Sequence, residues 1–142
     1  IMVDLWSKFR LNVCNNLPQA ILGAGVGCYR DSEHMRIISD ALKSELEAVA
    51  TAKGIDLSLA EGPSVYGSAV PPSARYSTLQ DLDSGRHTEI DMFSGALVRM
   101  GRELGIPMPY NEFAYHMIKA LEEKNDGLFD YEGRENERTC AR

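Results

Sequence analysis

Apolar residues recur at intervals of three and four along most of the 142 residues, which is the spacing of one face of an α-helix. This pattern predicts helices at about residues 2–22, 31–54, 74–82, 88–105 and from 111 to about 124. No run of alternating apolar and polar residues has the length of a strand. The chain is therefore predicted to be all-α, a bundle of roughly five to seven helices joined by short connections.

Residues that favour helix ends stand at the boundaries of these segments. Asp31 or Ser32 can cap the second helix, Thr88 the fourth and Asn111 the last, because a side-chain oxygen can accept a hydrogen bond from the first turn. Gly54 is expected to end the second helix. The positions predicted to face the core from the second and last helices are Met35, Ile38, Leu42, Leu46, Val49, Phe113, Met117 and Leu121.

The first helix carries a polar stripe. Lys8, Asn12 and Asn16 recur every four residues, so on a helix they form one narrow line. The flank beside this line is apolar and consists of Met2, Trp6, Phe9, Val13 and Leu17. An ammonium group and two carboxamides at the edge of a buried face can bind a small polar anion. On spacing alone, an ordinary solvated helix flank is the more common interpretation.

Charge and cysteine content exclude several classes of function. The chain has 15 Lys and Arg against 21 Asp and Glu, a net charge of −6, so it lacks the basic face that nucleic acid binding requires. Cys14, Cys28 and Cys140 have no CxxC spacing, and His34 and His116 lack ligand-spaced partners. We therefore expect reduced thiols, no metal site and a cytoplasmic protein. No apolar run approaches the ~20 residues of a membrane span, and no membrane partner is expected.

Several segments interrupt the helical pattern. Pro18 predicts a kink or break near Leu17, because it lacks a backbone donor. The glycines at 23–27 superficially suggest a phosphate-binding loop, but a helix precedes them where that motif needs a strand, so a flexible turn is predicted. Residues 55–74 are predicted to be mainly irregular. From residue 125 onward the sequence is polar, and a frayed or disordered tail is expected.

Several motifs, in order along the chain, together resemble one known family. They are Lys8-x-x-x-Asn12-x-x-x-Asn16, Ser77-Thr-Leu-Gln-Asp81, Gly85-Arg-His-Thr-Glu89-Ile-Asp91 followed by Gly95, and Gly105-Ile-Pro-Met-Pro-Tyr-Asn111. This set resembles the C-terminal domain of the ketopantoate reductases (2-dehydropantoate 2-reductases) from about residue 4 to about residue 121. The resemblance implies a helical domain over residues 1–124, of the 6-phosphogluconate dehydrogenase C-terminal-like type.

In that family a nucleotide-binding domain of Rossmann type precedes the helical domain, and the active site lies between the two. This chain begins at Ile1 within a helical pattern, so we expect it to be a piece of a longer protein, without the Rossmann domain. The family reduces the ketone of 2-dehydropantoate in the pathway to pantothenate and coenzyme A. The resemblance implies a 2-keto acid substrate and NADPH, the latter bound mainly by the missing domain. The isolated chain is expected to be inactive.

The resemblance also implies roles for individual polar residues. Lys8 is implied to be the catalytic lysine, which hydrogen-bonds the ketone oxygen and protonates it. A cation at a developing alkoxide stabilises the transition state more than the ground state. Asn12, Asn16 and Ser77 are implied to bind substrate. Glu89 is implied to be catalytic and to contact substrate or cofactor across the cleft. A carboxylate near Lys8 would help to keep it protonated, a hypothesis that requires Lys8 and Glu89 to share one side of the domain.

Other interpretations stay open. Taken singly, Ser77 suits a helix end or loop, and Glu89 suits a surface position at a helix start. Thr78 stands where the family often has methionine, and Gly25 to Gly27 stand where some members have a further substrate asparagine. The chain could therefore serve a reductase of another 2-keto acid. An alternative of a different class is a non-catalytic helical dimerisation module, and a homodimer is compatible with both.

Overall fold

Helices dominate the structure, a computed structural model that describes residues 2–59, 70–129 and 131. Within these ranges there is no strand, so the predicted all-α class is confirmed. A π-helical segment η1 (Asn12–Asn16) and two 3-10 turns, η2 (Leu57–Leu59) and η3 (Ile90–Met92), accompany the α-helices. The α-helices are α1 (Met2–Leu11), α2 (Leu17–Leu22), α3 (Cys28–Asp31), α4 (Glu33–Ala52), α5 (Ser77–Asp83), α6 (Ser94–Leu104) and α7 (Pro109–Asn125).

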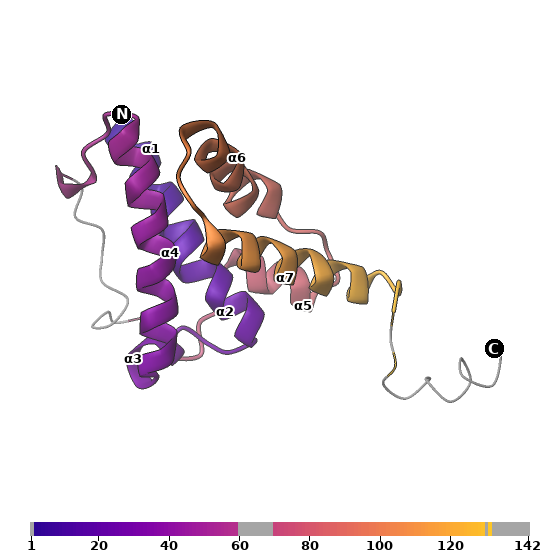
Figure 1. The fold of residues 1–142 in the computed structure, drawn as a ribbon. Coiled ribbons are helices and arrows are strands. Elements are labelled where there is room, and N and C mark those ends of the chain that lie inside the picture. Colours follow the sequence, from indigo (N-terminus) through magenta and orange to yellow (C-terminus); the bar gives the residue numbers. More distant parts are fainter. Residues whose placement is uncertain (1, 60–69, 130, 132–142) are drawn as a thin grey trace.

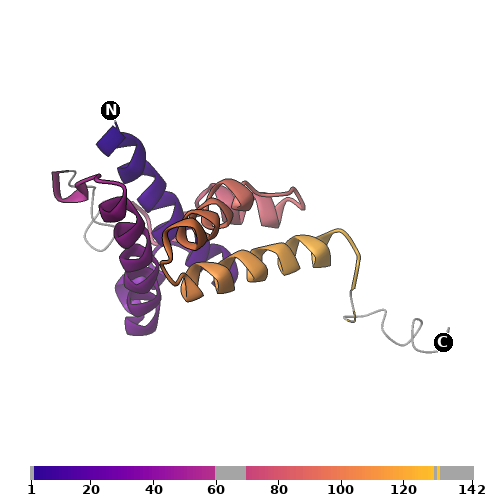
Figure 2. The ribbon, with the colours of Figure 1, turned by 45° about the horizontal axis from the view of Figure 1, so that its top comes forward.

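The two longest helices set the arrangement of the others. In Figures 1 and 2, α4 and α7 cross at a steep angle, and α7 extends away from α4. Helices α1 and α2, joined by η1, follow one another as a bent rod that packs against α4, while α6 packs against both α4 and α7. Helix α5 contacts α2, η1 and α7. The segment that precedes α5 is thereby brought beside the first helical rod.

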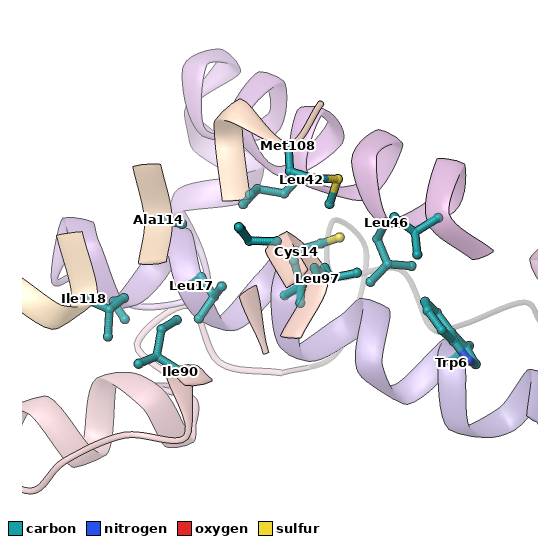
Figure 3. Close-up of a cluster of buried hydrophobic side chains, with 14 of the residues drawn as sticks. Trp6, Cys14, Leu17, Leu42, Leu46, Ile90, Leu97, Met108, Ala114 and Ile118 are labelled. Atoms are coloured by element: carbon teal, nitrogen blue, oxygen red, sulfur yellow. The ribbon is translucent and has the colours of Figure 1, made fainter. Parts of the chain in front are cut away.

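The core lies where α2, α4, α6 and α7 meet (Figure 3). Complete burial of an aliphatic side chain contributes roughly 1.5–3 kcal/mol to folding, relative to leaving it exposed. The largest aliphatic side chains with no more than 1% of their surface exposed are Leu17, Leu42, Leu46, Ile90, Leu97 and Ile118. Most of the predicted apolar face of the first and second helices is therefore confirmed.

Some predicted core positions are wrong. Met2 is 56% exposed, Ile38 39% and Phe113 63%. On α7 the buried face is rotated relative to the predicted one and includes two polar residues. Hydrophobic periodicity could not find this face, because the burial of a polar side chain depends on a hydrogen-bond partner from another segment. The residues of α7 that are buried are Asn111, Ala114, Ile118 and Glu122.

The helix ends follow the sequence signals in part. Ser32 caps α4, accepting a hydrogen bond from the backbone N–H of Met35 at 3.2 Å, and Gly54 follows its end with φ +79°. Asn111 does not cap the last helix but lies inside α7. The helix predicted over 88–105 is split, because Phe93 has non-helical φ and ψ of −101° and −102° between η3 and α6.

Parts of two predicted irregular regions lie outside the described residues, namely 60–69 of the long loop and 130 and 132–142 of the tail. In the ranges that the structure describes, no helix combines the length and the apolar content needed to cross a membrane.

Candidate functional site

The polar stripe of the first helix lies where the helical rod changes its winding. Helix α1 ends at Leu11, the π turn follows, and α2 begins at Leu17 with Pro18 in its first turn. Because proline has no N–H to donate to the preceding turn, regular α-helical bonding is interrupted there. The predicted distortion is thus confirmed, although it occupies Asn12–Asn16 before Leu17. Single π turns inside helices are frequent at functional sites.

Tyr29 stabilises this distorted stretch. Its hydroxyl donates a hydrogen bond to the backbone carbonyl of Asn15 and accepts one from the backbone N–H of Gln19, at 3.1 Å. The side chain thereby bridges two groups that would bond each other directly in a regular α-helix. Tyr29 is fully buried, and burial raises the pKa of its hydroxyl. The sequence analysis missed Tyr29, whose only signal is an aromatic residue two positions after the last glycine of the glycine-rich segment.

Gln19 connects the first helical rod to the segment before α5. Its side-chain Nε2 donates to the carbonyl of Ala74 at 2.9 Å, and its Oε1 accepts from the N–H of Tyr76 at 2.8 Å. The side chain is fully buried, so these bonds form away from water. Ser77, the first residue of α5, follows this clamp directly. Gln19 was also missed, because a glutamine on a helix gives no indication of a partner 55 residues away.

The predicted site residues divide into a paired and an unpaired group. Asn16 is 7% exposed, and its Nδ2 donates to Oδ1 of the half-buried Asn12 at 3.2 Å. Ser77 is exposed on α5, which contacts η1. Lys8 and Glu89 are exposed, and in the described part of the chain they form no ion pair with each other. The proposed influence of Glu89 on Lys8 therefore stays a prediction.

Side chains of α7 form hydrogen bonds with residues on both sides of Glu89. Glu122 Oε2 accepts from the N–H and from the hydroxyl of Thr88, each at 2.7 Å. On the other side, the Tyr115 hydroxyl donates to Asp91 Oδ1 at 2.7 Å and lowers the pKa of that carboxyl. Glu122 is 3% exposed, whereas the exposed Glu89 side chain has no hydrogen-bond partner among the described residues. A free carboxylate on a fixed backbone is suited to contact a ligand.

The glycine-rich turn is filled by protein. A Cβ on Gly25 would lie 2.2 Å from the carbonyl oxygen of Pro72, and one on Gly27 would lie 2.7 Å from Pro72 Cβ. The N–H of Gly27 donates to that same carbonyl at 2.9 Å, and the N–H of Val26 donates to the carbonyl of Ala74 at 2.8 Å. The glycines allow this close approach of two backbones. The turn is therefore a packing contact, which supports the rejection of a phosphate-binding loop.

Thiol and metal chemistry find little support in the described residues. Cys14 is 4% exposed, and burial raises its pKa to about 12, which disfavours the reactive thiolate. Burial also raises the pKa of Cys28. Over the described ranges, no group of three or more His, Cys, Asp or Glu side chains is arranged to hold a metal ion.

Comparison with known proteins identifies relatives across nearly the whole chain. The family model "Ketopantoate reductase PanE/ApbA C terminal" matches residues 1–122. A 2-dehydropantoate 2-reductase from Vibrio cholerae is 35% identical over 127 residues, which cover 87% of this chain and 42% of that protein. The chain thus spans about four-tenths of the length of the curated relatives it matches.

Solved structures share the fold. A PanE/ApbA family ketopantoate reductase from Ralstonia eutropha JMP134 has a TM-score of 0.77 and 31% identity, over 89% of this chain and 43% of that one. A D-mandelate dehydrogenase solved with NADH and anilino(oxo)acetate has a TM-score of 0.79 at 24% identity, over 89% and 54%. A dimeric ketopantoate reductase from Staphylococcus aureus has a TM-score of 0.75 at 20% identity, over 88% and 44%. The last two show likeness of fold alone.

The motifs that the sequence analysis singled out, the all-helical architecture and the match over residues 1–122 agree with one another. This chain therefore belongs to the ketopantoate reductase family, as its C-terminal helical domain.

Proposed function

We propose that this domain supplies the substrate-binding and catalytic residues of an NADPH-dependent 2-dehydropantoate 2-reductase that acts in the cytoplasm. The observation that carries the proposal is the pair formed by Asn12 and Asn16 on the π turn, next to the helix that begins at Ser77. These residues stand in the motifs by which the chain resembles the family. The rest of the enzyme is then a preceding domain of Rossmann type.

The asparagine pair leaves groups available for a substrate. Its internal hydrogen bond uses one N–H of Asn16 and one lone pair of Asn12 Oδ1. The amide group of Asn12 can still donate, and Oδ1 of Asn16 can still accept. A 2-keto acid with a hydroxyl group offers both an acceptor carboxylate and a donor hydroxyl, which fits this combination. The Ser77 hydroxyl, exposed at the start of α5, adds a further donor and acceptor.

Lys8 has the chemistry of the general acid. Its ammonium group carries three donors, one of which hydrogen-bonds the ketone oxygen of the substrate. As negative charge develops on that oxygen, the attraction to the ammonium group grows, so the transition state gains more than the ground state. Lys8 then transfers a proton to the oxygen and completes the alcohol. Glu89 acts as a hydrogen-bond acceptor for substrate or cofactor.

The described residues can contact only a small part of the cofactor. Gly25 and Gly27 are packed against Pro72, so they leave no glycine turn free for a phosphate. The exposed Glu89 carboxylate can accept hydrogen bonds from ribose hydroxyls or an amide. When bound, NADPH supplies the hydride for the ketone carbon. Most of its contacts are assigned to the preceding domain, so the isolated chain should bind it weakly and be inactive.

A different 2-keto acid is the alternative substrate on the same fold. A D-mandelate dehydrogenase with the same fold was solved with NADH and anilino(oxo)acetate. Thr78, the departure from the family's common methionine, is 2% exposed. This substitution therefore lies at a buried position next to Ser77 in the chain rather than on an open surface, and a change in buried packing can reshape a substrate pocket.

A homodimer is also proposed. The dimer belongs either to the active enzyme or to a non-catalytic module whose only function is dimerisation. Helices α2, α4 and α7 enclose an apolar groove of about 430 Å³, lined by side chains that include Pro18, Ile21, Ile38 and Phe113. A ketopantoate reductase of the same fold from Staphylococcus aureus is dimeric, and a second copy of this chain is the occupant we propose. Size-exclusion chromatography with light scattering on the complete protein tests this, and Phe113→Glu should yield monomers.

The function is tested by expressing the complete protein and following NADPH oxidation with ketopantoate and a panel of other 2-keto acids. We expect ketopantoate to be the best substrate and the 142-residue chain alone to show no turnover. Preference for another keto acid would keep the reaction but change the substrate. If no keto acid is reduced, the dimerisation module becomes the better account. Tight, stoichiometric NADPH binding by the isolated chain would contradict the assigned division between domains.

A further inference from the structure

Glu122 lies under the segment that presents Glu89. It is 3% exposed and belongs to the last turn of α7, 34 residues from Thr88. One carboxylate oxygen accepts both hydrogen bonds from Thr88. Lys119 Nζ, at 3.7 Å from the other oxygen, provides compensating positive charge. A buried carboxylate that accepts several hydrogen bonds near a cation is held in one orientation, because losing a partner would leave charge uncompensated.

The Thr88 hydroxyl, held by Glu122, in turn restrains the residues that follow it in the chain. Its hydroxyl oxygen accepts a hydrogen bond from the N–H of Ile90 at 3.2 Å, across Glu89. The Ile90 side chain is completely buried in the core, so it anchors the next residue. Glu89 therefore has a fixed residue on each side while its own carboxylate is exposed. The backbone of Glu89 is positioned, and its side chain remains available.

We infer that Glu122 and Thr88 are positioning residues for the proposed reaction: the Glu122–Thr88 clamp sets where the Glu89 carboxylate meets the substrate or cofactor. This inference rests on the proposed function. A shift of about 1 Å in a positioned catalytic group can reduce the rate by roughly 100-fold. Weakening the hydrogen bonds between Glu122 and Thr88 should therefore lower kcat by displacing the Glu89 carboxylate. The same change should have little effect on kcat when that carboxylate has been removed.

The other end of α7 offers a matched control. There the Glu45 carboxylate accepts hydrogen bonds from the N–H groups of Tyr110 and Asn111, each at 2.9 Å. This clamp resembles the one at Glu122 in chemistry, but it joins α7 to α4 and touches no candidate site residue. Glu45→Gln should lower stability without changing the steady-state constants.

The test is a double-mutant cycle in the complete protein, with ketopantoate and NADPH. Thr88→Val keeps the side-chain shape but removes the hydroxyl, and Thr88→Ser restores it. We expect Thr88→Val to lower kcat by about 10- to 100-fold in the presence of Glu89, and by less than about 2-fold when Glu89→Gln is already in place. Thr88→Ser should stay within about 3-fold of the wild type. Hydrogen–deuterium exchange of residues 86–93 should rise in Thr88→Val.

An equal loss of kcat in both Glu89 backgrounds would overturn the inference, as would a folded Thr88→Val variant with wild-type kcat. If Thr88→Val does not fold, Glu122→Gln enters the same cycle, since its amide oxygen can still accept from the Thr88 N–H. The two proposals fail differently. If the wild-type enzyme is active and the effects of the two substitutions are additive, only the inference about the Glu122–Thr88 clamp is wrong. If the wild-type protein reduces no keto acid, both the proposed function and the clamp inference are wrong.

Discussion

The hydroxyl of Tyr29 donates a hydrogen bond to the backbone carbonyl of Asn15, in the π turn that carries Asn12 and Asn16. The same hydroxyl accepts from Gln19, whose side chain holds the segment before Ser77. One buried network therefore joins the π turn, the glycine-rich turn and the start of α5. The shape of the candidate site depends on residues that do not themselves face a substrate.

Replacing Tyr29 by Phe should destabilise the protein. The change leaves the Asn15 carbonyl and the Gln19 N–H without their partner in a buried place, which costs about 1–3 kcal/mol. Urea unfolding followed by circular dichroism measures the loss. Tyr110→Phe is the matched control, because Tyr110 is 47% exposed and its hydroxyl forms no hydrogen bond in the described part of the chain. Equal stability of the two variants would contradict the network.

His87 should titrate above its ordinary pKa. Its Nε2 lies 2.6 Å from Asp126 Oδ2, and this hydrogen bond, with the charges of Asp126 and Glu122, raises the pKa of His87 from 6.5. Protonation is thus favoured in the folded state. The associated stability is fully present below the unfolded value of 6.5 and is lost as the pH rises through the folded-state pKa.

An NMR titration of the His87 ring checks this. Asp126→Asn should lower the pKa of His87 towards its value in the unfolded chain. Glu123→Gln changes an exposed side chain of the same helix and should leave the pKa of His87 unchanged. A His87 pKa that does not respond to Asp126→Asn would show that the contact has no electrostatic effect.

Cys14 should resist alkylation in the folded protein. Burial raises its pKa from 9.0 to about 12, so at pH 8 a much smaller fraction of it is thiolate than of a free thiol. Iodoacetamide labelling with peptide mass spectrometry, in buffer and then in urea, measures the difference. Labelling of native Cys14 as fast as in urea would place it outside the core.

The sequence located the helices and the polar stripe because both leave local patterns. Helix α4 follows its predicted bounds closely, since its apolar period and its Ser32 cap agree. The stripe was found from its four-residue spacing, and the roles of its members came from the resemblance of several motifs in order. Local pattern and motif order were enough for fold class and family.

The residues that support the site left no local pattern. Gln19, Tyr29 and Glu122 are polar residues buried by partners ten to 57 residues away in the chain. Their burial depends on tertiary hydrogen bonds, and hydrophobic periodicity treats such positions as solvent-facing. The same reason explains the misplaced face of α7. Supporting residues of this kind need the three-dimensional structure.

The most direct test of the account replaces Lys8 by Ala in the complete protein and measures kcat for ketopantoate reduction. Loss of a general acid should lower kcat by about 10²- to 10⁴-fold, while circular dichroism stays unchanged because Lys8 is exposed. Lys43→Ala, at an exposed position of α4, is the control and should keep wild-type activity. A Lys8→Ala enzyme with wild-type kcat would contradict the central claim that the polar stripe carries the chemistry.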